Sequence, residues 1–178
     1  MKKLILMVIA CMVGVCGMAG ADKTQGENKP VDNTPVEALE LKRYLGSWYE
    51  IARFDHWFER GLEQTKALYT LREDGMIRVE NTGIKNGETK QSIGKAKTTD
   101  QPALLRISFF GPFYGDYRIL LIDKDYQYAL VGGSSDAYLW IFSRTPKLEE
   151  DTLAIILAEA QRRGYDTSKL IWVKHEGE

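Results

Sequence analysis

Cysteine is scarce in this chain of 178 residues, and both cysteines, Cys11 and Cys16, lie near its N-terminus. The rest of the chain therefore has no disulfide, thiol nucleophile or thiolate metal site. Only two histidines are present, His56 and His175, and neither has the neighbours of a metal site or a catalytic triad. Basic residues do not exceed acidic ones, 24 against 25, so the charge gives no reason to expect a nucleic-acid partner. The residues thus argue against thiol enzymes and nucleic-acid-binding proteins, and we expect neither metal nor cofactor.

Long apolar runs are also missing, except at the N-terminus. There Lys2 and Lys3 precede an apolar stretch over residues 4–15. A basic leader followed by about a dozen apolar residues is typical of an export signal and is too short for a stable bilayer anchor. The folded part of the protein is therefore expected outside the cytoplasm.

Two processing routes fit this leader. An Ala-x-Ala site ending at Ala21 makes residues 1–21 a cleaved export signal and leaves a soluble periplasmic protein. Acylation at Cys16 instead makes residues 1–15 the signal of a lipoprotein anchored to the outer membrane. The sequence leaves both alternatives open.

Residues 22–40 are polar, include Pro30 and Pro35, and contain few large apolar side chains. This composition predicts a flexible tether that does not pack by itself. It serves either as a spacer from a membrane or as an N-terminal extension with no role. The remaining residues, 41–175, are enough for one domain with a full core.

Short β-type runs recur within that domain, separated by turn signals. The sharpest hairpin signals are Asp-Gly at 74–75 and Asn-Gly at 86–87, because both tolerate the positive φ of tight turns. This pattern predicts an antiparallel barrel or sandwich. We expect strands at 47–54, 65–72, 76–82, 90–97, 103–109, 117–122, 128–132 and 138–143.

The apolar period changes after these strands. Leu153, Ile156, Leu157 and Ala160 recur at helical spacing, and Gly164 is placed to stop a helix. We expect one helix after the eight strands, followed by a closing strand over 169–173.

Three sequence blocks connect this pattern to a known family. Residues 46–53 read Gly-Ser-Trp-Tyr-Glu-Ile-Ala-Arg, which resembles the lipocalin signature Gly-x-Trp-Tyr-Glu-Ile-Ala-Arg. Residues 124–126, Lys-Asp-Tyr, resemble the lipocalin Thr-Asp-Tyr turn except at Lys124. Residues 142–144, Phe-Ser-Arg, match the arginine that ends the last barrel strand. The likeness is strongest to bacterial outer-membrane lipocalins and extends from about residue 41 to 173.

The resemblance implies an all-β fold, an eight-stranded antiparallel up-and-down barrel with one C-terminal α-helix packed on its outside and a short final strand. It also implies that Arg144 lies across the Trp48 ring at the closed end, a cation–π contact. The residues given a structural role are Gly46, Trp48, Asp125, Tyr126 and Arg144.

Side chains alternate between the two faces of a strand, so one face of each strand should point into the barrel. In the first strand this places Trp48, Glu50, Ala52 and Phe54 on one side, and Tyr49, Ile51 and Arg53 on the other. Inward residues of a small barrel either fill a core or line a cavity, and the resemblance favours a cavity. The predicted cavity residues are Ala67, Tyr69, Ile77, Val79, Leu105, Ile107, Phe109, Tyr138 and Trp140.

Two connections carry many aromatic residues, one after the first strand and one between the fifth and sixth. Exposed aromatics there suit an apolar ligand, a partner or a membrane, whereas a structural plug is the alternative. Arg53, Arg60 and Lys66 are close enough in sequence to place positive charge near the same rim, which would suit a phosphate or carboxylate head group, or they are ordinary solvated surface charges. The predicted mouth residues are Phe54, Trp57, Phe58, Phe113, Tyr114 and Arg53.

The resemblance implies a non-catalytic protein that binds, stores or transports fatty acids and lysophospholipids at the periplasmic side of the outer membrane, in membrane maintenance. It also implies a homodimer. Two alternatives are an interaction protein that uses the aromatic mouth and, with less support, an enzyme. For the enzyme, Glu50 is the candidate, because a buried inward carboxyl has a raised pKa. A hydrogen-bonded structural acid is the more common explanation of such a residue.

Overall fold

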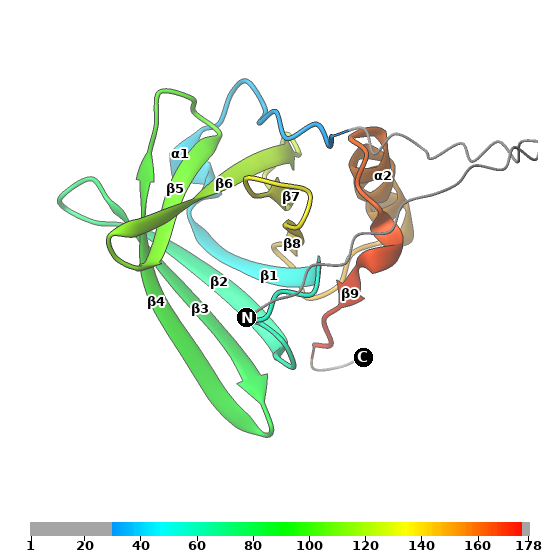
Figure 1. Cartoon of the computed structure of the whole chain (residues 1–178), viewed down its shortest axis with the longest axis horizontal. Helices are drawn as coiled ribbons and strands as arrows, with labels where there is room; N and C mark the ends of the chain where they lie inside the picture. The colour runs from blue at the N-terminus through cyan, green and yellow to red at the C-terminus, as the bar shows by residue number, and fades with distance from the viewer. Residues whose placement is uncertain (1–29, 176–178) are drawn as a thin grey trace, which may run out of the picture.

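The computed structural model describes residues 30–175 (Figure 1). The predicted export signal, Cys11, Cys16 and the cleavage site at Ala21 lie outside this range. Within it, the elements follow one another as α1 (Leu41–Tyr44), β1 (Gly46–Arg53), β2 (Glu63–Leu71), β3 (Ile77–Lys85), β4 (Glu88–Thr98), β5 (Leu104–Phe110), β6 (Phe113–Ile122), β7 (Tyr128–Gly132), β8 (Leu139–Ser143), α2 (Glu150–Arg162), the 3-10 helix η1 (Thr167–Lys169) and β9 (Ile171–Trp172).

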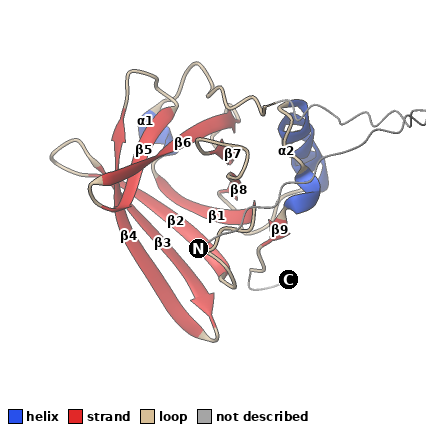
Figure 2. Ribbon diagram, in the orientation of Figure 1, coloured by secondary structure: helices blue, strands red, loops and turns tan. Residues whose placement is uncertain are grey.

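One antiparallel sheet closes on itself (Figure 2). Strands β1 to β8 pair in chain order, and β1 also pairs with β8. The tight turns use the predicted residues, with positive φ at Gly75, Asn86 and Gly87. The predicted eight-stranded antiparallel barrel is confirmed. The closing strand is also present, and β9 pairs with β1 outside the closed set of eight.

Helix α2 covers part of the outer wall, beside β7 and β8 (Figure 1). Its residues Ile156 and Ala160 are completely buried against outward side chains of the barrel, which include Leu130 and Ile141. Gly164 follows the helix with φ of +90°, a conformation that glycine adopts without strain at a helix C-terminus. The predicted external helix is confirmed.

Residues 30–40 differ from the flexible tether that we expect over 22–40. The backbone N–H of Asp32 donates to the Arg163 carbonyl, and that of Val36 donates to Ile119. The Arg163 guanidinium, itself buried, donates to the carbonyl of Thr34 at 2.7 Å. This part of the chain thus lies along the barrel and α2, because backbone hydrogen bonds compensate for its shortage of apolar side chains.

A bulge in β1 overturns the predicted side-chain alternation. The register with β8 shifts between Glu50 and Ala52, and a bulge moves later side chains to the opposite face. Ala52 and Phe54 therefore pack on the helix side of the wall. Arg53 instead lies beside Glu50, with 2.6 Å between Nη1 and the carboxylate oxygen.

The closed end of the barrel is held by Trp48 and Arg144. The Arg144 guanidinium lies 3.7 Å from the centroid of the Trp48 ring, and it donates to the carbonyls of Arg43, Leu45 and Ser47 at 2.7–2.9 Å. The indole N–H of Trp48 donates to the Tyr44 carbonyl at 2.8 Å. These contacts attach α1 across the end of the barrel.

The turn between β6 and β7 supports this closure. Tyr126 has a positive φ of 59°, and its hydroxyl accepts from the backbone N–H of Glu40 at 2.8 Å. Its carbonyl accepts from Arg144 Nε at 3.1 Å. The neighbouring Asp125 contributes through its backbone, donating to the Asp123 carboxylate at 3.0 Å. Gly46 has a positive φ of 93° where β1 begins.

Candidate ligand-binding cavity

The barrel encloses a cavity of about 440 Å³. This volume lies within the range of about 300–1,000 Å³ that is usual for small-molecule sites. Its wall combines inward side chains of the strands with residues of the loops at the mouth. The cavity is thus large enough for a small organic molecule, and the barrel interior is not completely filled by its own side chains.

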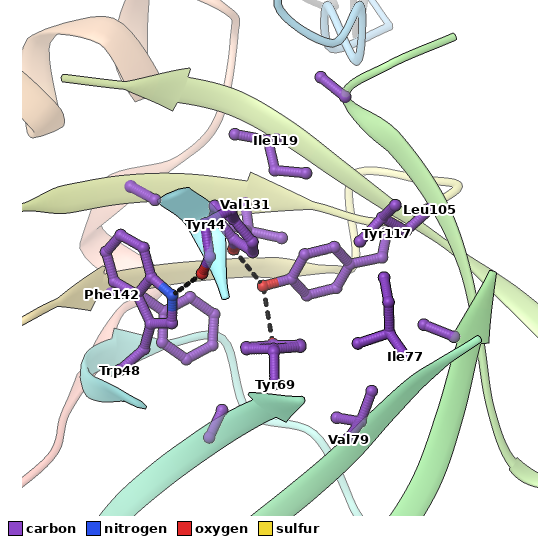
Figure 3. Packing of buried hydrophobic residues seen from close by; sticks show 14 of the residues in the cluster. Tyr44, Trp48, Tyr69, Ile77, Val79, Leu105, Tyr117, Ile119, Val131 and Phe142 are labelled. Carbon is purple, nitrogen blue, oxygen red and sulfur yellow. Dashed lines mark hydrogen bonds between the residues drawn. The ribbon is translucent and has the colours of Figure 1, made fainter. Parts of the chain in front are cut away.

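Three hydrogen-bonded tyrosines mark the floor of the cavity, which Tyr69 and Tyr117 line (Figure 3). The hydroxyls of Tyr44 and Tyr117 are 2.6 Å apart, and Tyr69 donates to Tyr117 at 2.9 Å. Burial raises the pKa of all three phenols above their ordinary value, so they remain neutral. Hydrogen bonding within the group satisfies these buried hydroxyls, and the floor is therefore uncharged.

Seven of the nine predicted cavity residues line the cavity, while Ile77 and Leu105 do not. The latter two are completely buried in the cluster beside the floor, where they pack against other side chains (Figure 3). The strand alternation therefore identified inward residues, but it did not show which of them pack in the core and which line the cavity. The lining residues are Ala67, Tyr69, Val79, Ile107, Phe109, Tyr138 and Trp140.

Three of the six predicted mouth residues line the cavity at its rim: Trp57, Phe58 and Phe113. Trp57 is 78% exposed and Phe113 is 77% exposed. Their aromatic rings therefore meet solvent beside the opening rather than folding back as a buried plug.

The other three predicted mouth residues lie elsewhere. Phe54 packs against Tyr165 on the helix side, with ring centroids 6.1 Å apart. Tyr114 lies under the ammonium groups of Lys95 and Lys97, and it does not line the cavity. The prediction that Arg53 supplies free positive charge at the rim is wrong, because the bulge buries it against Glu50.

Polar residues also line the cavity, and most of them were not predicted, because only apolar and aromatic side chains were taken as cavity residues. Extending the alternation from Ala67 to Thr65, and from Val79 to Asn81, would have found two of them. Thr65 is only 5% exposed and its hydroxyl lies beside the Glu50 carboxyl, whereas the Oδ1 of Asn81 has no hydrogen-bond partner among residues 30–175. Glu50, which the alternation placed inward, lines the cavity as well, and other lining residues that were not predicted are Glu59, Ser108, Phe110, Tyr117 and Phe142.

Three carboxyl groups line the cavity, and one of them, Asp116, is paired with Arg118 at 2.8 Å, which leaves Glu50 and Glu59. Burial raises the pKa of Glu50, while the Arg53 guanidinium opposes the rise. Burial also raises the pKa of Glu59, to about 8, and the neighbouring Glu50 adds to that shift. The Trp140 indole N–H donates to Glu59 at 3.1 Å. Glu50 is thus a paired acid, and Glu59 is largely protonated at neutral pH.

Neither histidine has a catalytic arrangement. His56 is stacked between Phe58 and Tyr138, with ring centroids 5.3 and 5.2 Å away, and burial lowers its pKa to about 4. The ring of His175 is hydrogen-bonded to the backbone carbonyl of Glu50 at 2.9 Å. Across residues 30–175, no cluster of His, Cys, Asp or Glu could hold a metal ion. In the same range, no helix has the length and apolar character needed to cross a membrane.

Comparisons with known proteins agree with this architecture. The family model described as a lipocalin-like domain matches residues 39–175. The outer membrane lipoprotein Blc of Escherichia coli K12 is 51% identical over 148 residues, covering 81% of this chain and 84% of that protein. The protein of the same name from Vibrio cholerae is 42% identical over 178 residues, covering 96% and 98%.

A solved structure supports the fold alone. Insecticyanin from the tobacco hornworm Manduca sexta superposes with a TM-score of 0.70 at 21% identity, covering 84% of this chain and 87% of that one.

Proposed function

The chain belongs to the lipocalin family, and on that premise we propose that it binds and carries single-chain lipids, namely fatty acids and lysophospholipids. The observation that carries the proposal is the cavity of about 440 Å³ with a largely apolar wall and an aromatic rim. In keeping with relatives named as outer membrane lipoproteins, the protein is exported to the outer membrane or the periplasm. Its role there is the maintenance of that membrane.

Elementary energetics support such binding without covalent chemistry. Removing a chain of about 15 methylenes from water gains roughly 12 kcal/mol, at about 0.8 kcal/mol for each methylene. Association costs about 4–15 kcal/mol, and a micromolar complex needs about 8 kcal/mol. A chain whose methylenes are mostly inserted therefore reaches micromolar affinity when the association cost is at the lower end of that range.

The proposal includes a non-catalytic role. The His56 ring is neutral and enclosed by aromatic rings, and Glu50 is paired with Arg53 at 2.6 Å. These contacts suit structural roles better than proton transfer. A turnover assay with lysophospholipid should therefore release no product beyond the background of the buffer.

The processing of the N-terminus and the oligomeric state also remain predictions. Acylation at Cys16 and release after Ala21 both fit the leader, and the names of the relatives favour acylation. Mass analysis of the mature N-terminus distinguishes them, since an intact Asp22 start means a soluble protein. The homodimer implied by the family resemblance is checked by sedimentation velocity.

An interaction protein is the second candidate, and the exposed aromatic rim favours it. Native mass spectrometry of protein purified from its own cell envelope separates the two candidates. A co-purified lipid supports the carrier. A lipid-free barrel bound to a polypeptide supports the interaction protein and overturns the carrier.

A further inference from the structure

An uncompensated acidic group lies at the mouth end of the cavity. Two carboxyl groups, those of Glu50 and Glu59, share one guanidinium, that of Arg53. Arg53 pairs with Glu50 at 2.6 Å, and its other terminal nitrogen donates to the carbonyls of Glu59 and Leu62. The Glu59 carboxyl receives one hydrogen bond, from Trp140, and no cationic partner among the described residues. If both carboxyls are ionised, one negative charge remains unpaired.

The basic residues on the cavity wall do not supply the missing charge. Lys66 and Lys90 are both exposed. The Lys66 ammonium lies 4.6 Å from the Tyr49 ring centroid on the outer face of β1 and β2, and Lys90 pairs with Glu88 at 2.5 Å. In the empty cavity a proton on Glu59 compensates for the charge instead, in keeping with its raised pKa of about 8.

A second, independent feature marks this part of the wall as a place for a polar group. Thr65 is almost completely buried and lines the cavity. Its hydroxyl is close enough to the Glu50 carboxyl to lower the pKa of that group, yet it makes no hydrogen bond of normal geometry to it. The Oδ1 of Asn81, on the next strand, is also unsatisfied. Trp48 pairs with Ala67, so the next inward residues, Glu50 and Thr65, adjoin across β1 and β2. Buried polar atoms without partners are rare in native proteins. A primary ammonium would donate to these oxygen atoms, and a trimethylated one would be attracted to them by charge alone.

Aromatic rings line the same cavity, and one of them, Trp140, contacts the Glu59 carboxyl. Trp57, Phe58, Tyr138 and Trp140 line the same cavity, and the Tyr138 and Trp140 rings are 6.0 Å apart. Aromatic groups attract alkylated ammonium ions through the negative faces of their rings. The combination of a carboxyl, several rings and unpaired oxygen atoms suits a cation better than a carboxylate or phosphate.

We infer that this end of the cavity is a subsite for a cationic head group, a primary or trimethylated ammonium carried by a single-chain lipid. The inference rests on the proposed function and deepens it, because it selects lipids that bear an ammonium group over simple fatty acids. The ligand cation takes the place of the proton on Glu59, which leaves to solvent as the cation binds. The hydrocarbon chain then occupies the apolar part of the cavity.

Proton release makes the binding depend on pH, and the direction follows from Glu59. A cation binds to the ionised carboxyl, so its affinity should rise as the pH rises towards about 8. Of the other groups nearby, Glu50 is held by Arg53, Tyr69 has a pKa raised further above its ordinary value, and His56 has a pKa lowered to about 4. The two rings therefore keep one charge state between pH 6 and pH 9.

The test compares two probes with the same chain, dodecyltrimethylammonium and 1-dodecanol, below their aggregation limits. Calorimetric titration of the full mature protein should show the cation binding up to about 100-fold more tightly at pH 9 than at pH 6, with dodecanol unchanged. Equal cation affinity at the two pH values overturns the inference. If neither probe binds, the proposed function itself fails.

The variant Glu59→Gln sharpens the test, because glutamine can still accept from Trp140 but cannot ionise. Its cation affinity should be low and independent of pH, whereas its dodecanol affinity should match the wild type. The matched control is Glu63→Gln, an exposed residue at the start of β2 that does not line the cavity. Retained pH-dependent cation binding in Glu59→Gln overturns the inference. If that variant does not fold, the wild-type pH profile decides alone.

Discussion

The two ends of the barrel differ in how fully their polar groups are hydrogen-bonded. At the closed end, Arg144 donates to several backbone carbonyls and stacks on Trp48, and the floor tyrosines pair with one another. At the mouth, Asn81 Oδ1 has no hydrogen-bond partner among residues 30–175 and Trp57 is exposed to solvent. Since unsatisfied groups reduce stability, the comparison indicates that the closed end stabilises the fold and the mouth is shaped for a ligand.

The largest effect should come from Arg144→Ala at the closed end. It removes a cation–π contact worth about 0.5–2 kcal/mol and leaves carbonyls that cost about 1–3 kcal/mol when buried without partners. We expect the free energy of unfolding to fall by about 3–4 kcal/mol, measured by urea denaturation, with unchanged ligand preference in the folded protein. Altered selectivity at unchanged stability would contradict the assignment.

A matched arginine at the mouth provides the control. Arg60 is exposed and pairs with Asp55 at 2.7 Å, and such surface pairs contribute about 0–1 kcal/mol. Arg60→Ala should therefore leave the unfolding midpoint almost unchanged. A loss as large as that of Arg144→Ala would remove the contrast between the two ends.

An intermediate effect is expected for Glu59→Gln on stability. Because the pKa of Glu59 is raised to about 8 in the folded protein, its contribution is present below the unfolded pKa and is lost as the pH rises through about 8. The wild type should lose about 2 kcal/mol between pH 6.5 and pH 8.5 at about 1.4 kcal/mol per pH unit, and the variant should lose less. The range begins at pH 6.5 because the His56 contribution, with a lowered pKa, is lost only below it.

Denaturation of both proteins at the two pH values measures this difference directly. Glu63→Gln again serves as the control and should follow the wild type. Parallel stability profiles for Glu59→Gln and wild type would show that Glu59 has no raised pKa in the fold.

The smallest effect on stability should come from Trp57→Ala. Its side chain is 78% exposed, and substitutions at such positions usually change stability by less than about 0.5 kcal/mol. The ring lines the cavity rim, so lipid affinity should still fall severalfold. A fluorescence titration measures the affinity and thermal unfolding measures the stability. A large drop in stability with unchanged lipid affinity would contradict this role and would indicate that the rim residues are structural.

The fold could be predicted from the sequence because its signals are local. Alternating strands, Asn86-Gly87 and a change to helical period after the eighth strand each specify an element through short-range geometry. The family signature then distinguished a closed barrel from a sandwich. Residues 30–40 were harder, because their packing depends on backbone hydrogen bonds to Arg163 and Ile119, which no side-chain pattern records.

The site was predicted only in part, for two physical reasons. A single bulge in β1 reversed the faces of Arg53 and Phe54, and nothing in the alternation marks where a strand gains an extra residue. Inward polar residues of the strands, Thr65 and Asn81, were also overlooked, because only apolar and aromatic side chains were taken as cavity residues. Glu59 lies in the connection between β1 and β2, where strand alternation gives no prediction. The cavity depth depends on how Ile77 and Leu105 pack in three dimensions, which spacing alone does not show.

The most direct measurement is a titration of a fluorescent fatty acid into three proteins: wild type, Ala67→Trp and Leu68→Trp. Ala67 faces the cavity from β2, whereas Leu68, the next residue, is partly exposed on the outer wall. We predict micromolar binding to the wild type and to Leu68→Trp, and at least tenfold weaker binding to a folded Ala67→Trp, because the indole occupies the hollow. Equal binding by all three proteins, or by none, would contradict an internal lipid site.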